Sequence, residues 1–332
     1  MNIFVTGGAG FIGSHLCERL LLLGHDLIVL DNFNDFYDPA IKRRNFAEVA
    51  ETARRLGRSL TLSEGDIRDS RFLEMTLGEG EPEAVIHLAA MAGVRPSIER
   101  PALYAEVNLG GTLNLLDASR AAGVRRILFA SSSSVYGNSP TVPFAESDPV
   151  DTPISPYAAT KKGGELLCHT WHHLYGISIA CLRFFTVYGP RQRPDLAIHK
   201  FARMLSRGEP LPIYGDGSTS RDYTYVDDII DGVIKALEWT GGDIPRYGIF
   251  NLGESRPVAL RRLVSVLEEA MGMPAQRVEL PMQIGDVELT FADLTKSASQ
   301  LGYRPSTEIE SGIARFVAWF REEQRRVPGA PE

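Results

Sequence analysis

Between residue 1 and about residue 182, short β-branched runs alternate with longer stretches whose apolar residues recur at helical spacing. This rhythm is typical of a parallel sheet covered by helices on both faces. Gly24, Gly123 and Gly176 follow three of the helical stretches and suit a left-handed helix stop. The sequence therefore predicts a doubly wound α/β domain. The expected strands are 3–6, 27–30, 60–63, 84–88, 126–130 and 177–182, and the expected helices include 11–23, 102–122 and 157–175.

The rhythm breaks beyond residue 183, where prolines and glycines become frequent, and helical periodicity returns clearly at 259–271 and 308–325. With 332 residues the chain exceeds the ~100–200 residues of one ordinary domain. We expect two units and a frayed tail. The first unit is 1–182, and residues 223–250 return to it with a helix at 226–239. The second unit is a smaller α/β lobe made of 183–222 and 251–326. The tail is 327–332.

Charge and cysteine content narrow the class of protein. Lys+Arg 35 against Asp+Glu 42 leave a net charge of −7, which argues against a general nucleic-acid surface. Cys17, Cys168 and Cys181 are widely spaced without a C-x-x-C pair, which favours reduced thiols over disulfides or zinc, and the histidines show no metal-ligand spacing. Because no basic leader and no apolar run of ~20 residues occur, we expect a cytoplasmic protein without a membrane partner.

A glycine-rich loop, Thr6-Gly7-Gly8-Ala9-Gly10-Phe11-Ile12-Gly13, follows the first expected strand and opens the first helix. Gly7, Gly10 and Gly13 permit a tight turn, approach of the backbone to a pyrophosphate, and close helix–sheet contact. The N-terminus of the helix offers free N–H groups and a positive dipole to phosphate. In this context the loop predicts a dinucleotide site.

Acidic residues after the second and third strands extend this site. Asp31 is placed to accept hydrogen bonds from both adenosine ribose hydroxyls, and no arginine follows within Asn32-Phe33-Asn34 to hold a 2′-phosphate, so NAD is favoured over NADP. Asp66 and Ile67 are placed to meet the adenine edge. Asp66 is equally well placed to cap the helix that follows instead of contacting adenine.

Tyr157 and Lys161 lie four residues apart on one expected helix, so both side chains can reach the same pocket. A free phenol titrates near ~10 and is a poor base at neutral pH unless a fixed positive charge stabilises the phenolate. Lys161 can supply that charge.

With these motifs, the chain resembles an extended short-chain dehydrogenase/reductase of the nucleotide-sugar epimerase/dehydratase type. The similarity covers nearly the whole chain, through 6–13, 88–90, 131–137, Tyr157/Lys161 and 221–228. It implies that the first unit binds NAD as a Rossmann domain and that the smaller lobe binds a nucleotide sugar. The further cofactor contacts that it implies are Phe11, Ile12, Asn32, Leu88, Ala89, Ala90, Asn108, Phe184 and Val187, besides Tyr157 and Lys161.

The resemblance also implies that a serine hydrogen-bonds the substrate hydroxyl and the tyrosine. Ser132 is the candidate, although Ser133 and Ser134 beside it leave the choice open. Dehydratases of the family carry Asp-Glu where this chain has Ser133-Ser134, and hydroxyls serve poorly as the acid and base of an elimination. We therefore expect epimerisation at C4: Tyr157 takes the C4 hydroxyl proton, hydride passes to a tightly bound NAD, and hydride returns to the other face of the 4-keto sugar.

Residues 183–195 and 91–97 are similar to the pattern of UDP-glucuronate 4-epimerases. Arg193 is the candidate to bind a C6 carboxylate bidentately, with Arg95 and Ser97 nearby and Ser133 or Ser134 assisting. The alternative is that these arginines contact the diphosphate or only rim the cleft.

The uridine diphosphate contacts rest on the same resemblance. Thr186, Lys200 and Arg221 are expected on the diphosphate, and Ile213 and Tyr214 against the uracil. Gln283 and Asp286 belong to a turn that meets the uridine ribose, although Ile284 stands where that turn usually has proline.

Other functions remain alternatives: a UDP-glucose or UDP-N-acetylglucosamine 4-epimerase, then a UDP-glucuronate decarboxylase, then a non-catalytic NAD sensor. The sensor is disfavoured because Ser132, Tyr157 and Lys161 are all present. Helices 102–122 and 157–175 resemble those through which the family forms dimers, so a homodimer is expected.

Overall fold

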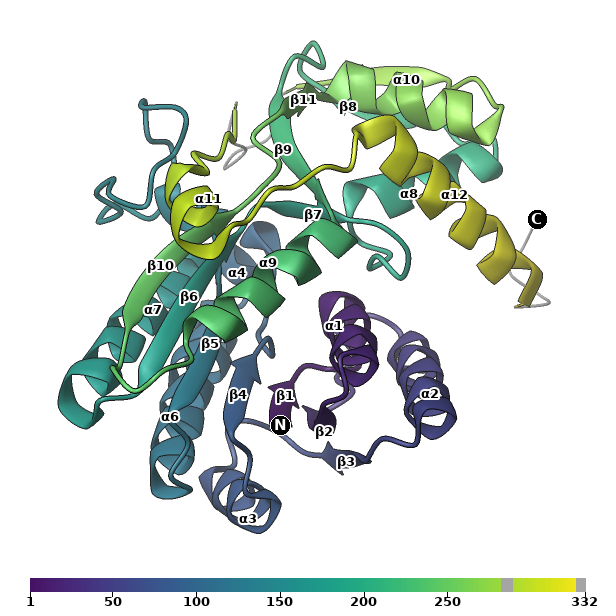
Figure 1. Ribbon diagram of the computed structural model, residues 1–332. Helices are drawn as coiled ribbons and strands as arrows, with labels where there is room; N and C mark the ends of the chain where they lie inside the picture. Colours follow the sequence, from purple (N-terminus) through teal and green to yellow (C-terminus); the bar gives the residue numbers. More distant parts are fainter. Residues whose placement is uncertain (282–288, 327–332) are drawn as a thin grey trace.

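The core of the protein is a seven-stranded parallel sheet with the strand order β10-β6-β5-β4-β1-β2-β3 (Figure 1). The computed structural model describes residues 1–281 and 289–326. The expectation of a doubly wound α/β fold is confirmed. The strands of this sheet are β1 (Asn2–Thr6), β2 (Asp26–Asp31), β3 (Leu60–Glu64), β4 (Ala84–His87), β5 (Arg126–Ser132), β6 (Ser178–Phe184) and β10 (Tyr247–Leu252).

Helices cover both faces of this sheet, and two separate groups of buried apolar side chains result. All four residues of β4 and all seven of β6 are buried, as expected for strands covered on both sides. One face carries α1 (Phe11–Leu22), α2 (Pro39–Leu56) and α9 (Val226–Trp239), and the other carries α3 (Ser70–Gly80), α6 (Gly111–Ala121) and α7 (Pro156–Tyr175).

β5 and β6 each continue two residues beyond their expected ends. Their register pairs Ser131 with Arg183 and Ser132 with Phe184. Sequence periodicity weakens at these polar residues, whereas the ladder between the two strands continues. The extension matters because it carries Ser132 and Phe184 to the carboxyl edge of the sheet, where ligands of such folds bind.

After the first six strands the chain leaves the sheet, and α9 and β10 then rejoin it. α9 buries one face, including Ile229 and Val233, against β5 and β6. β10 pairs in parallel with β6, from Tyr247 opposite Ile179 to Leu252 opposite Phe184.

Most of the other elements after β6 form a second lobe above the carboxyl edge of the sheet (Figure 1). It holds a three-stranded sheet in the order β11-β9-β7 and a β12–β8 pair. Its strands are β7 (Thr186–Tyr188), β8 (Leu211–Tyr214), β9 (Ser220–Tyr225), β11 (Pro257–Ala259) and β12 (Arg277–Leu280), and its helices are α8 (Ala197–Ser206), α10 (Leu260–Met271) and α12 (Ile309–Arg326). α11 (Thr295–Leu301) instead contacts α9 and β10 beside the large sheet.

Residues 102–122 do not form the single regular helix that their periodicity predicts. The chain runs from α5 (Pro101–Ala105) through a π-helical turn, η1 (Glu106–Gly110), into α6. Such turns often lie at functional sites. Two further short elements border the site: α4 (Val94–Glu99) and a 3₁₀ turn, η2 (Ser133–Tyr136).

Within residues 1–281 and 289–326, no helix combines the length and the apolar character needed to cross a lipid bilayer.

Candidate active site

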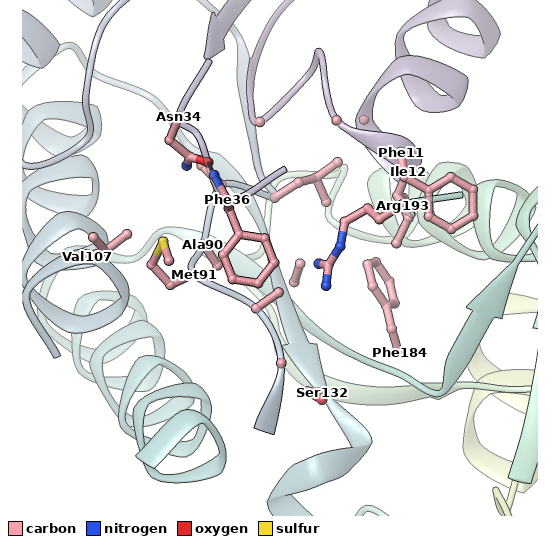
Figure 2. A pocket seen from close by; sticks show the side chains of 18 of the residues that line it. Phe11, Ile12, Asn34, Phe36, Ala90, Met91, Val107, Ser132, Phe184 and Arg193 are labelled. Atoms are coloured by element: carbon pink, nitrogen blue, oxygen red, sulfur yellow. Dashed lines mark hydrogen bonds between the residues drawn. The ribbon is translucent and has the colours of Figure 1, made fainter. Parts of the chain in front are cut away.

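A pocket of about 400 Å³ opens at the carboxyl edge of the large sheet (Figure 2). Its walls come from the glycine-rich loop, from the ends of β2, β4 and β5, and from the segment that links β6 to β7. The order β4-β1-β2 makes this the position where chain connections diverge to either side, the usual ligand crevice of doubly wound sheets.

Two glycines of the loop have no room for a side chain. A β-carbon on Gly13 would lie 2.1 Å from the carbonyl oxygen of Gly7, and one on Gly7 would lie 2.8 Å from the amide nitrogen of Ala89. Gly7 also has a φ of +71°. These close approaches let α1 begin directly beside the pocket, where Phe11 and Ile12 join Gly7, Gly10 and Gly13 in its lining.

Asp31 lies at the end of β2 with its carboxylate in the pocket wall. It accepts hydrogen bonds from the amides of Ala9, at 3.1 Å, and Phe33, at 2.9 Å. Burial raises its pKa, and these two amides oppose that shift. A glycine cradle at a helix N-terminus beside a buried carboxylate at the second strand fits the pyrophosphate and ribose of NAD.

Asp66 does not cap α3. The helix is capped by Asp69, which accepts from the amide of Phe72 at 3.0 Å. Asp66 instead accepts from the Arg68 guanidinium, at 2.8 and 3.0 Å, and from the Asn32 amide at 3.0 Å. The hydrogen bond from Arg68 lowers the pKa of Asp66 to about 2. Asn32, Asp66 and Ile67 all line the pocket.

Asn108 holds the loop after β4 in place, and the cofactor contact expected of it stays a prediction. Its side chain is buried outside the lining: the amide oxygen accepts from the Met91 amide at 2.8 Å, and the amide nitrogen donates to the Met91 carbonyl and to Thr160 Oγ1, both at 3.0 Å. The π-helical turn places Asn108 under the loop after β4. The predicted residues Leu88, Ala89 and Ala90 of that loop line the pocket, as do Phe184 and Val187.

Ser132, Tyr157 and Lys161 meet in the pocket wall. Lys161 Nζ donates to the carbonyl of Ala130 at 2.7 Å and lies 5.9 Å from the centre of the Tyr157 ring. Burial raises the pKa of Tyr157, while a hydrogen bond from Ser132 lowers it. Burial lowers the pKa of Lys161 to about 8. A phenol, a hydroxyl and a buried cation thus adjoin, as proton transfer at a sugar hydroxyl requires.

Arg193 reaches the same pocket from the second part of the chain (Figure 2). Its guanidinium carbon lies 5.1 Å from the centre of the Phe36 ring. Its Nε and Nη2 donate to Asp195 at 3.0 and 2.7 Å. Asp195 therefore occupies one bidentate edge of the guanidinium. Ser133, Ser134 and Thr186, the other expected substrate contacts of this region, also line the pocket.

Ser97 lies outside the lining of the pocket. Its side chain is buried, and its hydroxyl donates to the carbonyl of Val94 at 2.5 Å. The substrate contact expected of Ser97 stays a prediction; in this structure the residue closes the first turn of α4 because its short hydroxyl reaches back three residues. Arg95, in the first turn of the same helix, is exposed. Its guanidinium carbon lies 5.8 Å from the centre of the Tyr214 ring of β8.

The remaining expected substrate residues do not line the pocket, and their contacts with a substrate stay predictions. Ile213 and Tyr214 are on β8, Arg221 is on β9, and Lys200 is exposed on α8. Gln283 and Asp286 fall outside the described residues.

The segment after β2 contributes lining residues that motif reasoning missed. Lys42 is buried and donates to the main-chain and side-chain oxygens of Asn34, both at 2.8 Å. Phe36 and Tyr37 complete this wall. These residues belong to no recognised motif. In the sequence, only the aromatic residues shortly after the second strand indicate that this segment could form a pocket wall.

Among the described residues, no three His, Cys, Asp or Glu side chains are grouped as metal ligands. Cys17, Cys168 and Cys181 are buried free thiols.

Comparison with known proteins agrees with this geometry. A UDP-glucuronate 4-epimerase of Thermodesulfobacterium geofontis is 42% identical over 320 residues, covering 96% of this chain and 95% of that protein. The crystal structure of UDP-glucuronic acid 4-epimerase from Bacillus cereus, in complex with UDP-glucuronic acid and NAD, matches with a TM-score of 0.89 at 34% identity, over 97% of this chain and all of that one. UDP-glucose 4-epimerase from Thermotoga maritima, solved with UDP-glucose, matches with a TM-score of 0.86 at 35% identity, over 98% of this chain and 100% of that chain.

The model of the NAD dependent epimerase/dehydratase family matches residues 3–253, a span that contains the glycine loop, Ser132, Tyr157 and Lys161. On this match and on the identity to its relatives, the chain belongs to the NAD dependent epimerase/dehydratase family.

Proposed function

We propose that the protein is an NAD-dependent 4-epimerase of UDP-sugars whose preferred substrate is UDP-glucuronate. The observation that carries the proposal is that a cationic side chain, Arg193, shares one pocket with Ser132, Tyr157 and Lys161. The identity to a UDP-glucuronate 4-epimerase supports it. NAD, held by the glycine loop and Asp31, would supply the hydride acceptor for oxidation at C4 and the hydride donor for the later reduction from the opposite face.

The side chains of the pocket move and hold the proton. Tyr157 removes the proton from the C4 hydroxyl, and Ser132 donates a hydrogen bond that favours the phenolate. The buried ammonium of Lys161 adds a positive charge beside the ring. After the 4-keto sugar has turned and hydride has returned to the other face of C4, Tyr157 gives the proton back to the same C4 oxygen. Because the cycle has no net redox change, we expect NAD to stay tightly bound.

A glucuronate substrate adds a demand on the site. Oxidation at C4 makes a β-keto acid, since the C4 carbonyl and the C6 carboxylate flank C5, and such acids lose CO₂ when the C5–C6 bond aligns with the carbonyl π system. Arg193, with Ser133 or Ser134, can hold the carboxylate out of that alignment. The pairing of Arg193 with Asp195 and its stacking on Phe36 fix the direction from which the guanidinium approaches.

The lobe above the sheet would hold the uridine diphosphate. Tyr214 and Ile213 on β8 are assigned to the uracil, and Thr186, Lys200 and Arg221 to the diphosphate. The contact between Arg95 and Tyr214 joins the two units beside this site. On this proposal residues 1–182 and 223–250 act as the cofactor domain, and 183–222 with 251–326 as the nucleotide-sugar lobe.

We also propose a cytoplasmic homodimer that pairs α6 and α7 with their counterparts. Leu113 on α6 and Leu166 on α7 are exposed apolar side chains, 41% and 57% accessible, and pairing would cover them.

A UDP-glucose 4-epimerase is the second candidate. Asp195 already compensates the charge of Arg193, so the pocket does not need a carboxylate from the substrate. The match to the Thermotoga maritima enzyme agrees equally well with this alternative.

Product analysis separates the candidates. The protein is incubated with UDP-glucuronate, UDP-glucose and UDP-N-acetylglucosamine in turn, and inversion at C4 and release of CO₂ are followed by NMR. We expect inversion of UDP-glucuronate without CO₂. Faster inversion of UDP-glucose would favour the second candidate, and CO₂ with a pentose product would identify a decarboxylase.

The Arg193→Ala variant tests the carboxylate contact. Because a charged hydrogen bond is worth about 1.5–3 kcal/mol, the KM for UDP-glucuronate should rise roughly 10- to 100-fold, while that for UDP-glucose changes only a few-fold. Arg95→Ala is the matched arginine control and should affect both nucleotides alike, because Arg95 lies beside Tyr214. Equal losses for both sugars in Arg193→Ala would remove the carboxylate role.

A further inference from the structure

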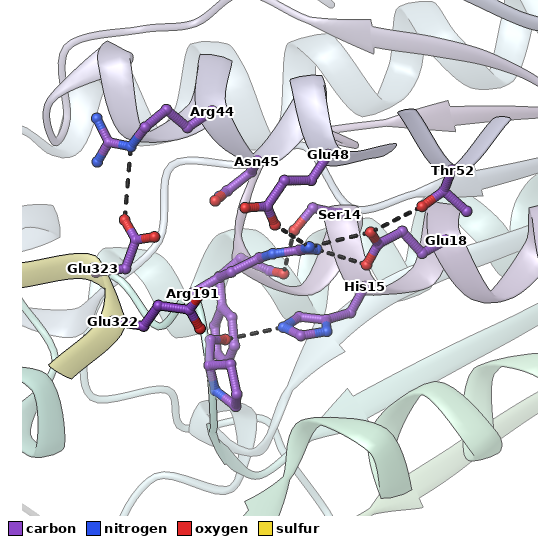
Figure 3. Close-up of polar contacts among 12 residues, drawn as sticks. Ser14, His15, Glu18, Arg44, Asn45, Glu48, Thr52, Arg191, Glu322 and Glu323 are labelled. Carbon is purple, nitrogen blue, oxygen red and sulfur yellow. Dashed lines mark hydrogen bonds and ion pairs between the residues drawn. The ribbon is translucent and has the colours of Figure 1, made fainter. Parts of the chain in front are cut away.

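The loop between β7 and α8, residues 189–196, is fastened to α1 and α2 through Arg191 (Figure 3). Arg191 Nη1 and Nη2 donate to the two carboxylate oxygens of Glu18 at 2.8 and 3.1 Å. Nη2 also pairs with Glu48 of α2. One residue earlier, the Pro190 carbonyl lies 2.9 Å from His15 Nε2, and since a carbonyl only accepts, the histidine nitrogen is the donor. The loop thus has ionic attachments to both helices and a neutral attachment to α1.

These attachments hold a backbone that the chain does not adopt readily. Arg191 has a φ of +60°, in the left-handed region that residues with a β-carbon seldom occupy. Only 10% of its side chain is exposed. The guanidinium is nearly buried, binds one carboxylate with two hydrogen bonds and pairs with a second carboxylate. This geometry is that of a specific structural contact, not of an exposed surface ion pair.

The acceptors belong to the part of the fold that forms the dinucleotide loop. Glu18 lies on α1, whose N-terminus borders the pocket, and it also accepts from Thr52 of α2 at 3.4 Å. On the same stretch of α2 as Glu48, Asn45 donates to the carbonyl of Ala9 at 3.3 Å. The contacts of Arg191 therefore fix its position relative to α1 and α2, the helices that hold the glycine loop.

Two residues after Arg191, Arg193 enters the pocket and stacks on Phe36, which follows β2. Two residues span at most ~7 Å, so a displacement of residue 191 passes almost directly to residue 193. We propose that Arg191 is a positioning residue: it ties Arg193 to the cofactor-binding half of the protein, so that the substrate's C6 group is held at a fixed place relative to the cofactor rather than relative to the nucleotide lobe. This inference rests on the proposed contact of Arg193 with the C6 carboxylate.

Nearby ion pairs supply a control. Arg326, at the end of α12, pairs with Glu48 at 3.2 Å, and Arg44 pairs with Glu323 at 3.7 Å. These arginines are 52% and 45% exposed, and their ion pairs connect α2 with α12, so we expect them to contribute little to the position of the loop. If the role of Arg191 consisted only of an ion pair with Glu48 of α2, Arg326 would share that role, because it pairs with the same carboxylate.

The test compares Arg191→Gln, Arg191→Lys and Arg326→Gln in the holoenzyme. Kinetics and calorimetric binding are measured with UDP-glucuronate and UDP-glucose, together with NAD content and melting temperature. In Arg191→Gln we expect KM and Kd for UDP-glucuronate to rise roughly tenfold or more, with at most a few-fold change for UDP-glucose and unchanged NAD content. Arg191→Lys should recover part of the loss because it keeps one ion pair, and Arg326→Gln should behave as the wild type.

A double-mutant cycle decides whether Arg191 acts through Arg193. In an Arg193→Ala background, Arg191→Gln should cause no further loss of UDP-glucuronate affinity, because the group that it positions is gone. Additive losses, or equal losses for both sugars, would overturn the inference. If the wild type shows no preference for UDP-glucuronate, the proposed function and this inference both fail. If Arg193→Ala loses the preference as expected but Arg191→Gln keeps it, only this inference fails.

Discussion

Ser132, Ser133 and Ser134 line the same pocket as Tyr157, and their backbone positions give them different surroundings. Ser132 ends β5, whereas Ser133 and Ser134 belong to the 3₁₀ turn η2. The Ser134 amide donates to Ser132 Oγ at 3.1 Å, and the two hydroxyl oxygens are also 3.1 Å apart. Ser132 is the serine whose hydrogen bond lowers the pKa of Tyr157. This geometry favours Ser132 as the residue that assists proton transfer.

Ser132→Ala should therefore lower kcat by on the order of 10²-fold. Loss of the hydrogen bond removes a contribution that lowers the pKa of Tyr157, so the pH at which the phenolate forms should move upward. The pH dependence of kcat for the wild type and the variant measures this shift. Ser134→Ala keeps the contact between Ser132 and Tyr157 and should not shift the profile; a shift confined to Ser134→Ala would assign the role to that serine.

Between the elements of the site, a buried ion pair joins α7 to β6. Glu165 follows Lys161 by one helical turn and accepts from Arg183 Nε and Nη2, both at 2.8 Å. Ser131, the neighbour of Ser132 on β5, donates to the same carboxylate at 2.6 Å. Both charged side chains are 1% exposed. The pair fixes the helix that carries Tyr157 and Lys161 against the strand end that carries Ser132.

Arg183→Leu should reduce the free energy of unfolding by about 3–5 kcal/mol, because it leaves the carboxylate of Glu165 buried without its main partner. The double variant Arg183→Leu/Glu165→Leu should be less damaging than the sum of the single changes, since no uncompensated charge remains. Urea denaturation measures these free energies. Arg262→Ala, which breaks an exposed pair with Glu310, should cost no more than about 1 kcal/mol. Additivity of the two buried changes would contradict the coupling.

At the scale of the whole molecule, a neutral histidine lies in the middle of the sheet. His87 ends β4, with Nδ1 2.7 Å from Thr6 Oγ1 and Nε2 3.0 Å from Thr112 Oγ1. Burial, together with the charge of Lys161, lowers its pKa to about 3. It joins β1, β4 and α6 beneath the cofactor pocket.

This histidine predicts acid sensitivity of the fold. An unfolded histidine titrates near 6.5 and the folded one near 3, so between these values the unfolded chain binds one more proton and stability falls as the pH falls. The contribution is up to about 1.4 kcal/mol per pH unit. His87→Gln should make the free energy of unfolding less steep between pH 6.5 and 5 by about that slope. His173→Gln, at the exposed side of α7, is the control, and an unchanged slope in His87→Gln would refute the assignment.

Local sequence patterns determined the scaffold and the chemical centre. The alternation of strand and helix periods, the glycine loop, Asp31 and the pair Tyr157/Lys161 are short-range features, because a backbone conformation or a helix face depends on residues within a few positions of one another. Those features were recognised, and the comparisons with known proteins support the family that they indicated.

Tertiary structure decided which distant segments meet. The burial of Ser97, the support that Asn108 gives to Met91, the wall formed by Phe36, and the attachment of Arg191 to Glu18 across 173 positions of sequence separation follow from packing of whole elements. Nothing in the residues near Arg191 distinguishes a buried anchor from an exposed charge, since its partners come from α1 and α2. The sequence by itself determined which reaction groups are present, and the fold determined how they are held.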